Sequence, residues 1–228
     1  MRRITLFLAA VATAGLGLLA APGASAAALP IQPGMRITVG TAGCTANFVY
    51  DGVGVSAGRT FIGTAAHCAS AVGDDVKDAN GAVFGDVAFI GNEDTTADDF
   101  AFIEVRTEDL GRVSTVVKGH SAPKGYTTAE EPVLGDTTTL SGYGTGFEVT
   151  GATREGRFGV VTYADSELYS VVGPIIYGDS GGPVVHDPSG KALGIVSRLC
   201  IGVCTEEGPT VEGILAKASD AGFPVTLR

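Results

Sequence analysis

The sequence predicts an all-β fold composed of two β units. Glycine supplies 34 of the 228 residues and proline 10, and the chain is rich in valine, alanine and isoleucine. The β-rich runs are short and broken by glycine, aspartate or asparagine, and only one stretch near the C-terminus has a helical pattern. This combination favours short strands joined by turns. All-β barrels often use about 200 residues as a single fold unit, so we expect one such unit here.

The first 26 residues predict a secretory signal peptide. Arg2 and Arg3 precede an apolar run that ends at Ala24-Ser25-Ala26, small residues of the kind that signal peptidase requires. A membrane anchor is the alternative, but the apolar run is barely the roughly 20 residues that span a bilayer, and nothing similar follows. We therefore expect a secreted, extracellular protein that does not contact the membrane once the signal is removed.

Charge and cysteine content restrict the partners and the compartment. Without residues 1–26, which contain two arginines and no acids, 13 basic and 25 acidic residues remain, a net charge of −12. This acidity argues against a nucleic-acid partner, and self-repulsion favours a soluble monomer. All four cysteines lie in the exported part, which suggests two disulfides in any of three pairings. They are Cys44, Cys68, Cys200 and Cys204.

The first β unit follows a short N-terminal segment. Residues 27–36 contain two prolines and no apolar period, so we expect a flexible lead-in or a prosegment there. Regular patterning begins at Ile37 and continues to about residue 120. The strands expected in this unit lie within 47–50, 59–67, 82–91 and 99–105.

The second β unit extends from about residue 133 to residue 228. Residues 118–136 are polar and contain two prolines, so we expect them to connect the units. The expected strands lie within 137–144, 157–164, 168–173, 181–186 and 192–199. Residues 211–222 fit a helix that glycine ends. Its expected apolar face and cap are Ile214, Leu215, Ala218 and Gly222.

The strongest local motif is the hexapeptide Gly178-Asp179-Ser180-Gly181-Gly182-Pro183. A nucleophilic serine needs an exposed turn whose neighbours leave room for a carbonyl group, and glycines provide that clearance. Backbone N–H groups in such a turn can also converge on one oxygen, as an oxyanion hole requires. A simple glycine-rich hairpin is the alternative, but the complete string is much more specific. We predict that Ser180 is a nucleophile.

A serine hydroxyl needs a base, and the chain has three histidines. His67 directly follows a β-rich run and precedes Cys68, which could fix its strand. His120 and His186 lie in polar, turn-like surroundings and are interpreted as ordinary surface residues. Context and elimination therefore select His67 as the base.

The imidazole in turn needs a carboxylate that fixes its tautomer. Asp99 opens the apolar run Phe100-Ala101-Phe102-Ile103, so a strand would carry its carboxylate into a partly buried position. Asp94 and Asp98 are competitors, but both lie in a looser stretch where solvated loop acids are expected. We predict that Asp99 is the third member of the triad.

The motifs TAAHC, DFAF and GDSGGP, in the order His, Asp, Ser, resemble those of the chymotrypsin-like (trypsin-like) serine peptidases. The resemblance covers roughly residues 37–228 and is greatest to the secreted bacterial branch that includes streptogrisins and α-lytic protease. It implies two perpendicular six-stranded antiparallel β-barrels with the active site in the cleft between them. His67 and Asp99 would come from the first barrel and Ser180 from the second.

The same resemblance implies roles for further residues. The N–H groups of Gly178 and Ser180 would form the oxyanion hole. The backbone of Val196-Ser197-Arg198 would pair with an extended substrate, and the Ser197 hydroxyl would support Asp99. Cys44 would pair with Cys68, and Cys200 would then close a small loop with Cys204.

Specificity is less clearly encoded. A trypsin-like pocket would place an aspartate six residues before the nucleophile, where this chain has Pro174, so we do not expect a preference for Lys or Arg by that route. Ile175, Ile176 and Tyr177 suggest an apolar lining that favours hydrophobic side chains. Glu212 lies on the segment that forms the opposite wall in relatives, where it would either attract a basic group or point outward as a surface acid.

Activation could follow one of two routes. Arg36 precedes Ile37-Thr38-Val39-Gly40, which is similar to the family's zymogen cleavage site, so a freed Ile37 amine could pair with Asp179. Bacterial relatives instead often satisfy that aspartate with an internal arginine.

The sequence therefore predicts a serine endopeptidase that acts on protein or peptide substrates through an acyl-enzyme on Ser180, with neither metal nor cofactor. Two alternatives remain. One is a triad hydrolase with mainly esterase activity or a very narrow substrate range. The other is a noncatalytic binding protein on the same fold.

Overall fold

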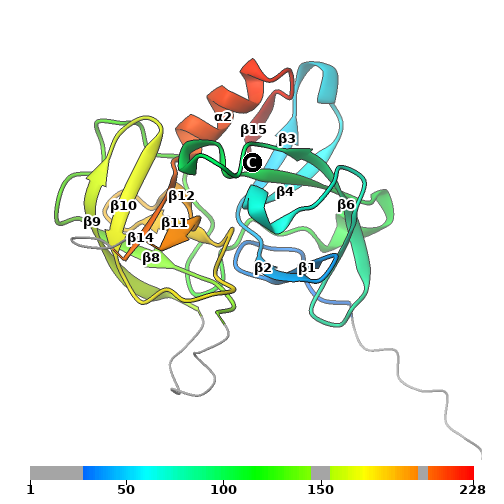
Figure 1. The fold of residues 1–228 in the computed structure, drawn as a ribbon, viewed down its shortest axis with the longest axis horizontal. Coiled ribbons are helices and arrows are strands. Elements are labelled where there is room, and N and C mark those ends of the chain that lie inside the picture. Colours follow the sequence, from blue (N-terminus) through cyan, green and yellow to red (C-terminus); the bar gives the residue numbers. More distant parts are fainter. Residues whose placement is uncertain (1–27, 145–154, 200–204) are drawn as a thin grey trace, which may run out of the picture.

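The computed structural model of the chain describes residues 28–144, 155–199 and 205–228. Its strands form two antiparallel sheets, and each sheet curls into a barrel-like half (Figure 1). A short α-helix lies near the C-terminus. The predicted fold class is therefore confirmed.

The first sheet combines the N-terminal half of the chain with its last strand. Its strands are β1 (Arg36–Val39), β2 (Ala42–Thr45), β3 (Val49–Gly52), β4 (Thr60–Thr64), β5 (Asp75–Lys77), β6 (Val83–Ile90), β7 (Ala101–Val105) and β15 (Val225–Leu227). They are ordered β15-β3-β4-β7-β6-β5-β1-β2. Four 3-10 turns connect them where the chain bends: η1 (Gly54–Ser56), η2 (Ala66–Cys68), η3 (Thr96–Asp98) and η4 (Thr107–Arg112).

The second sheet contains the strands that follow the connecting segment. They are β8 (Thr137–Leu140), β9 (Arg157–Ala164), β10 (Leu168–Val172), β11 (Pro183–His186), β12 (Lys191–Ile195), β13 (Arg198–Leu199) and β14 (Glu206–Pro209). Their order is β12-β11-β8-β9-β10-β14-β13. Within the described residues the sheets thus have eight and seven strands rather than six each, because short pieces such as β13 count separately and β15 joins the first sheet.

The C-terminal segment crosses back from the second half to the first. Helix α2 (Val211–Asp220) begins at Thr210, whose hydroxyl accepts a hydrogen bond from the Gly213 N–H, as an N-cap does. Gly222 has a positive φ of 78° just after the helix, as expected for its glycine cap. Strand β15 then pairs with β3, so the chain end belongs to the first sheet rather than to the second unit.

Apolar side chains form three clusters. One fills the first half, one fills the second half, and the third lies where the halves and α2 meet. The third cluster is rich in aromatic rings, with Phe102 stacked on Phe223 and in edge contact with Tyr50. This shared core fixes the two halves relative to each other, and any site between them is held by both.

The segment expected as a flexible lead-in is packed from Ile31 onward. Ile31 is fully buried in the core of the first half and forms an isolated bridge with Val113. Met35 is also buried, and β1 already begins at Arg36. The two prolines hid this role because they interrupt the apolar pattern that would indicate a strand.

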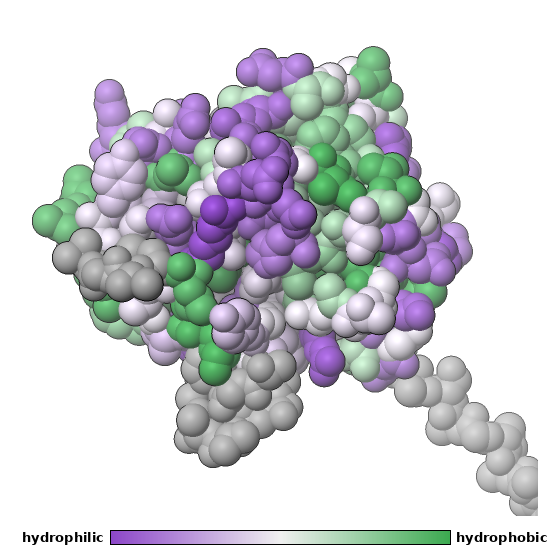
Figure 2. All heavy atoms as spheres, viewed as in Figure 1, coloured by the Kyte–Doolittle hydropathy of each residue, from purple (hydrophilic) through white to green (hydrophobic). Residues whose placement is uncertain are grey.

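The surface of the molecule reflects its acidic composition. Figure 2 shows hydrophilic residues gathered over the middle of one face, between the halves, with separate apolar patches on either side. None of the helices in the described ranges is long and apolar enough to span a bilayer.

Candidate active site

A cavity of about 570 Å³ lies between the two halves. Both halves contribute its lining. The lining residues are Ala42, Gly43, Cys44, His67, Ile175, Ile176, Tyr177, Gly178, Ser180, Val196, Ser197, Arg198 and Leu199. No group of three His, Cys, Asp or Glu side chains in the described part of the chain is arranged to hold a metal ion.

His67 is positioned by the turn that follows strand β4. It lies in η2, and its side chain is about one-third exposed at the cavity. A disulfide joins the neighbouring Cys68 to Cys44 on β2, which fixes this turn to the first sheet. The pairing implied by the family resemblance is therefore present. Cys200 and Cys204 lie outside the described residues.

Asp99 is the acid that the fold brings to His67. Its side chain is 1% exposed, and its Oδ2 lies 2.8 Å from His67 Nδ1 while its Oδ1 accepts the His67 backbone N–H at 2.9 Å. The Ser197 hydroxyl donates to the same carboxylate. Burial alone would raise the pKa of Asp99, but the hydrogen bonds from His67 and Ser197 hold that pKa below its ordinary value.

The two competing acids are used elsewhere or exposed. Asp98 pairs with Lys217 of α2 at 3.0 Å and accepts the Thr95 hydroxyl. Asp94 is exposed. Only Asp99 of the three contacts the imidazole. The 3-10 turn η3 ends at Asp98, and Asp99, the residue that follows it, turns inward.

The turn that carries Ser180 is anchored to the first half. Thr45 at the end of β2 donates its N–H to the Ser180 carbonyl at 2.9 Å and its hydroxyl to the Gly178 carbonyl at 2.8 Å. Gly181 has a φ of +83°, and a Cβ there would lie 2.5 Å from the Thr45 carbonyl oxygen. A glycine is therefore required at this point for both conformation and space. Sequence reasoning did not identify Thr45, because a lone threonine carries no motif.

Backbone donors alternate along this turn. The N–H groups of Asp179, Gly181 and Gly182 donate to carbonyls at 3.1, 2.7 and 2.8 Å. Those of Gly178 and Ser180 have no acceptor among the described residues. The two uncommitted donors therefore flank Asp179 and are free to receive an oxygen from outside the protein.

Ser180 and His67 both line the cavity, but in the structure described here their side chains are not hydrogen-bonded to each other. Such contacts are often long in a free enzyme and shorten when substrate binds. The geometry thus places the Ser180 hydroxyl and the His67 imidazole at one cavity, and the imidazole already contacts the buried Asp99 carboxylate.

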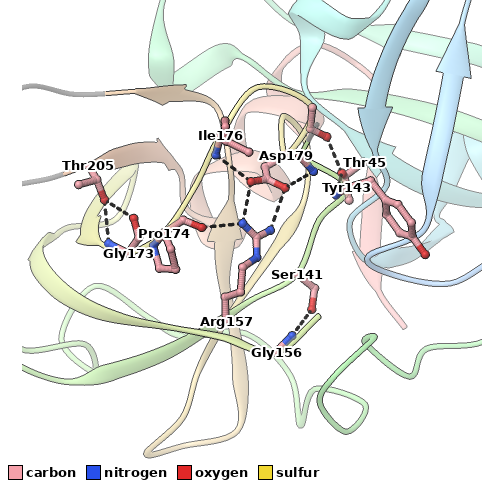
Figure 3. Close-up of polar contacts among 12 residues, drawn as sticks. Thr45, Ser141, Tyr143, Gly156, Arg157, Gly173, Pro174, Ile176, Asp179 and Thr205 are labelled. Atoms are coloured by element: carbon pink, nitrogen blue, oxygen red, sulfur yellow. Dashed lines mark hydrogen bonds and ion pairs between the residues drawn. The ribbon is translucent and has the colours of Figure 1, made fainter. Parts of the chain in front are cut away.

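Asp179 is held from several sides by hydrogen bonds (Figure 3). Arg157 forms two hydrogen bonds with its carboxylate, at 2.7 and 2.8 Å, and the N–H groups of Gly144 and Ile176 donate to it at 2.7 and 2.9 Å. Both charged side chains are almost completely buried. Of the two routes considered for this aspartate, the internal arginine is the partner observed, while Ile37 is buried within β1.

The predicted substrate-binding residues divide into two groups. Ile176, Tyr177, Ser197 and Arg198 line the cavity. Glu212 does not, because the helix begins at Val211 and places this acid in the first turn of α2. Strand β14, which pairs with the cavity-lining strand β13, instead carries two acids next to this wall, Glu206 and Glu207.

The interpretation of His186 as a surface residue is wrong. The His186 side chain is 3% exposed at the end of β11, and its ring nitrogens lie 2.9 Å from Asp136 and 2.8 Å from Ser189. Partners on both nitrogens allow the ring to be buried. His120 is partly exposed and lies 3.2 Å from the Ser121 carbonyl.

A buried acid that sequence reasoning missed lies behind the cavity. Glu206 is 0% exposed and accepts a hydrogen bond from the Tyr169 hydroxyl through Oε1, while its Oε2 has no partner in the described structure. Burial raises the pKa of Glu206 to about 8; the Tyr169 hydrogen bond opposes that rise. The surrounding sequence, Thr205-Glu206-Glu207-Gly208, is polar and typical of a turn, so it does not indicate that Glu206 is buried.

Comparison with known proteins identifies the family. The family model described as Trypsin matches residues 31–218. The chain belongs to the trypsin family. No curated protein matches it. As a trypsin-family member with the chymotrypsin-like fold, the chain has the architecture of a serine peptidase, including that of bacterial ones.

Solved structures of bacterial proteases share this fold. Thermobifida fusca protease A is 20% identical with a TM-score of 0.58, and the match covers 87% of this chain and 99% of that chain. Cellulomonas bogoriensis chymotrypsin is 18% identical with a TM-score of 0.57, covering 87% and 98%. A glutamic acid specific serine protease is 20% identical with a TM-score of 0.59, covering 87% and 100%. At these identities the likeness concerns the fold.

Proposed function

We propose that this trypsin-family chain is a secreted serine endopeptidase that hydrolyses peptide bonds through an acyl-enzyme on Ser180. The observation that carries the proposal is the contact between His67 and buried Asp99 at the cavity that Ser180 also lines. A carboxylate held below its ordinary pKa stays charged at neutral pH, so it can orient the imidazole and stabilise its protonated form.

The chemical steps use only groups at this cavity. Ser180 Oγ attacks the substrate carbonyl carbon, and His67 Nε2 accepts the hydroxyl proton. The oxygen that becomes negative accepts hydrogen bonds from the Gly178 and Ser180 N–H groups. His67 then gives the proton to the leaving amine, and the C–N bond breaks. Water, activated in the same way, hydrolyses the ester and restores Ser180.

Strand β13 offers an edge for the substrate. It is the outermost strand of the second sheet, pairs with β14 on one side, and lines the cavity through Arg198 and Leu199. An extended peptide can add to such an edge by backbone hydrogen bonds. The backbone of Ser197 and Arg198 would in this way align the scissile bond beside Ser180.

Activity should not require cleavage after Arg36. The carboxylate that a freed Ile37 amine would have to reach is already paired with Arg157. Ile37 is also fully buried and pairs with Cys44 in the sheet, so its release would break the edge of the first half. The internal arginine supports an enzyme that is competent without a zymogen switch.

Secretion is supported by the disulfide between Cys44 and Cys68, since such bonds persist in oxidising compartments. The N-terminal pattern of Arg2, Arg3 and Ala24-Ser25-Ala26 is consistent with export. Edman sequencing of material from the culture medium should give a start at Ala27. Retention of the intact N-terminus inside the cells would contradict the proposal.

Labelling with a fluorophosphonate probe tests the catalytic proposal. The native chain should be labelled on Ser180, and both Ser180→Ala and His67→Ala should prevent labelling. Digestion of a mixed peptide library should then give internal cleavages. A labelled chain that hydrolyses esters but no peptide would indicate an esterase, and an unlabelled, folded chain would indicate a binding protein.

A further inference from the structure

The buried acid Glu206 lies directly behind the wall of the cavity. Glu206 is paired with Leu199 in the β13–β14 register, and residues opposite each other in an antiparallel pair point to the same face. On the other face, Arg198 donates to the Glu93 carbonyl and Glu207 accepts the Thr96 hydroxyl, both on the first half. Glu206 therefore points the other way, into the second half, where its side chain is fully buried.

The two walls of the cavity converge on this acid. One wall is continuous with β13, the neighbour of β14. The other wall begins after Gly173, whose N–H and carbonyl both hydrogen-bond the Thr205 hydroxyl at 2.7 Å (Figure 3). Thr205 immediately precedes Glu206, so the start of β14, which carries this acid, is connected to both walls.

Apolar side chains separate the cavity from the acid. Ile175 and Val196 line the cavity and pack in the same cluster as Tyr169. Tyr169 in turn holds Glu206 by a hydrogen bond. Leu199 is 52% exposed, so it can turn outward to open a path at low cost.

A buried carboxyl with one oxygen lacking a partner is costly in a folded protein. Oε2 is that oxygen, and the charged groups that influence Glu206 are the already paired Asp179 and Arg157. A cation that arrives along the cavity would supply the missing donor. Lysine and arginine suit this path because their methylene stems match apolar walls while their ends carry the charge.

We propose that Glu206 is a specificity-determining residue, whose free oxygen binds the ammonium or guanidinium group of a lysine or arginine just before the scissile bond. The proposal rests on the peptidase function proposed above. It places the acid on β14, and it replaces Glu212 in the role that the sequence suggested for an acid on the opposite wall. The apolar lining then binds the stem of the basic side chain.

Two matched peptide substrates can test this inference. Each carries a chromogenic amide at its C-terminal end, and the residue just before that amide is lysine in one and norleucine in the other. The two side chains have similar length, but norleucine lacks the ammonium group. The native enzyme should prefer lysine by about ten- to hundredfold in kcat/KM, the range expected for a hydrogen bond to a charged group. Because burial raises the pKa of Glu206 to about 8, this preference should grow between about pH 6.5 and about pH 8.5.

Glu206→Gln should remove most of the lysine preference and leave norleucine hydrolysis within about twofold, since the amide can still accept from Tyr169. Glu207→Gln and Glu212→Gln are the matched controls, because they remove a neighbouring acid without touching the cavity, and both should keep the preference. Equal kcat/KM values for the lysine and norleucine substrates in the native enzyme would by themselves overturn the inference. Norleucine hydrolysis and Ser180 labelling would then still support the peptidase, whereas absence of both would overturn the proposed function and this inference with it.

Discussion

Two buried acids on opposite sides of the cavity have opposite electrostatic surroundings. Asp99, which lies behind His67 in the first half, is hydrogen-bonded by His67 and Ser197, and its pKa lies below the ordinary value. Glu206, in the second half, has a single hydrogen bond from Tyr169, and burial raises its pKa to about 8. Both side chains are almost inaccessible to solvent, yet Asp99 is charged and Glu206 is neutral at pH 7.

The difference follows from the hydrogen-bond partners of each acid together with its burial. Asp99 has donors for both oxygens, so its charge is available to His67 at all times. Glu206 keeps one oxygen free, so its charge must be induced by a partner from outside. The first arrangement suits catalysis and the second suits recognition.

The largest effect on activity should follow from neutralising Asp99, the acid that pairs with His67. Asp99→Asn should lower kcat by about 10⁴-fold, because the amide no longer fixes the tautomer of His67 or stabilises its protonated form. Steady-state hydrolysis of a chromogenic peptide measures this. Asp98→Asn is the control, because Asp98 pairs with Lys217 instead, and it should change kcat by less than about threefold. Equal losses in both variants would show that Asp99 has no special role.

Removal of the arginine that pairs with Asp179 should have the next largest effect. Arg157→Met leaves a completely buried carboxylate without its cation, so the free energy of unfolding should fall by about 3–5 kcal/mol in a urea titration. Arg106→Met is the control: it breaks ion pairs that are about one-third exposed or more, and it should lower the free energy of unfolding far less, because solvent screens such pairs. A small loss in Arg157→Met would mean that Asp179 is held mainly by backbone donors.

Neutralising Glu206, the acid with one oxygen unpaired, should increase the free energy of unfolding rather than lower it. Below pH 4.5 Glu206 is protonated in both the folded and the unfolded chain. Between pH 4.5 and about 8 its carboxyl ionises only in the unfolded chain, so the free energy of unfolding falls as the pH rises. Glu206→Gln removes this loss, and its stability relative to the native chain should rise across that window. Asp99, whose pKa is lowered, instead loses its contribution as pH falls. A constant difference between Glu206→Gln and native chain from pH 4.5 to 8 would contradict the raised pKa.

The smallest effect on activity should come from blocking the possible cleavage site after Arg36. Arg36→Gln prevents tryptic cleavage there, and kcat/KM should stay within about twofold of the native value because Asp179 already has Arg157. Assay of purified Arg36→Gln measures this. A protein that becomes active only when a freed Ile37 is produced would refute the zymogen-independent account.

Much of the site could be predicted from short motifs, because its residues lie in locally distinctive turns. The glycines around Ser180 and the strand before His67 indicate their conformation directly, and β4, β6, β7 and β9 fall within the expected runs. Asp99 was distinguishable from Asp98 because only Asp99 adjoins an apolar strand. These features depend on local chain geometry alone.

Other features depend on contacts between distant segments and gave no local signal. Strand β15 has three residues, too few to reveal that it pairs with β3. Glu206 lies in a polar stretch, and its burial results from pairing with both β10 and β13. His186 likewise owes its burial to Asp136, fifty residues earlier in the chain. Burial of polar residues of this kind follows from the three-dimensional fold.

Mass spectrometry of the acyl-enzyme tests the central claim most directly. The native chain is mixed with a slowly released active ester, quenched in acid within the burst, and mapped by peptide digestion. The account predicts one acyl group on Ser180, absent from both Ser180→Ala and Asp99→Asn. Peptide hydrolysis without any acylated residue, or acylation of another serine such as Ser189 beside His186, would contradict it.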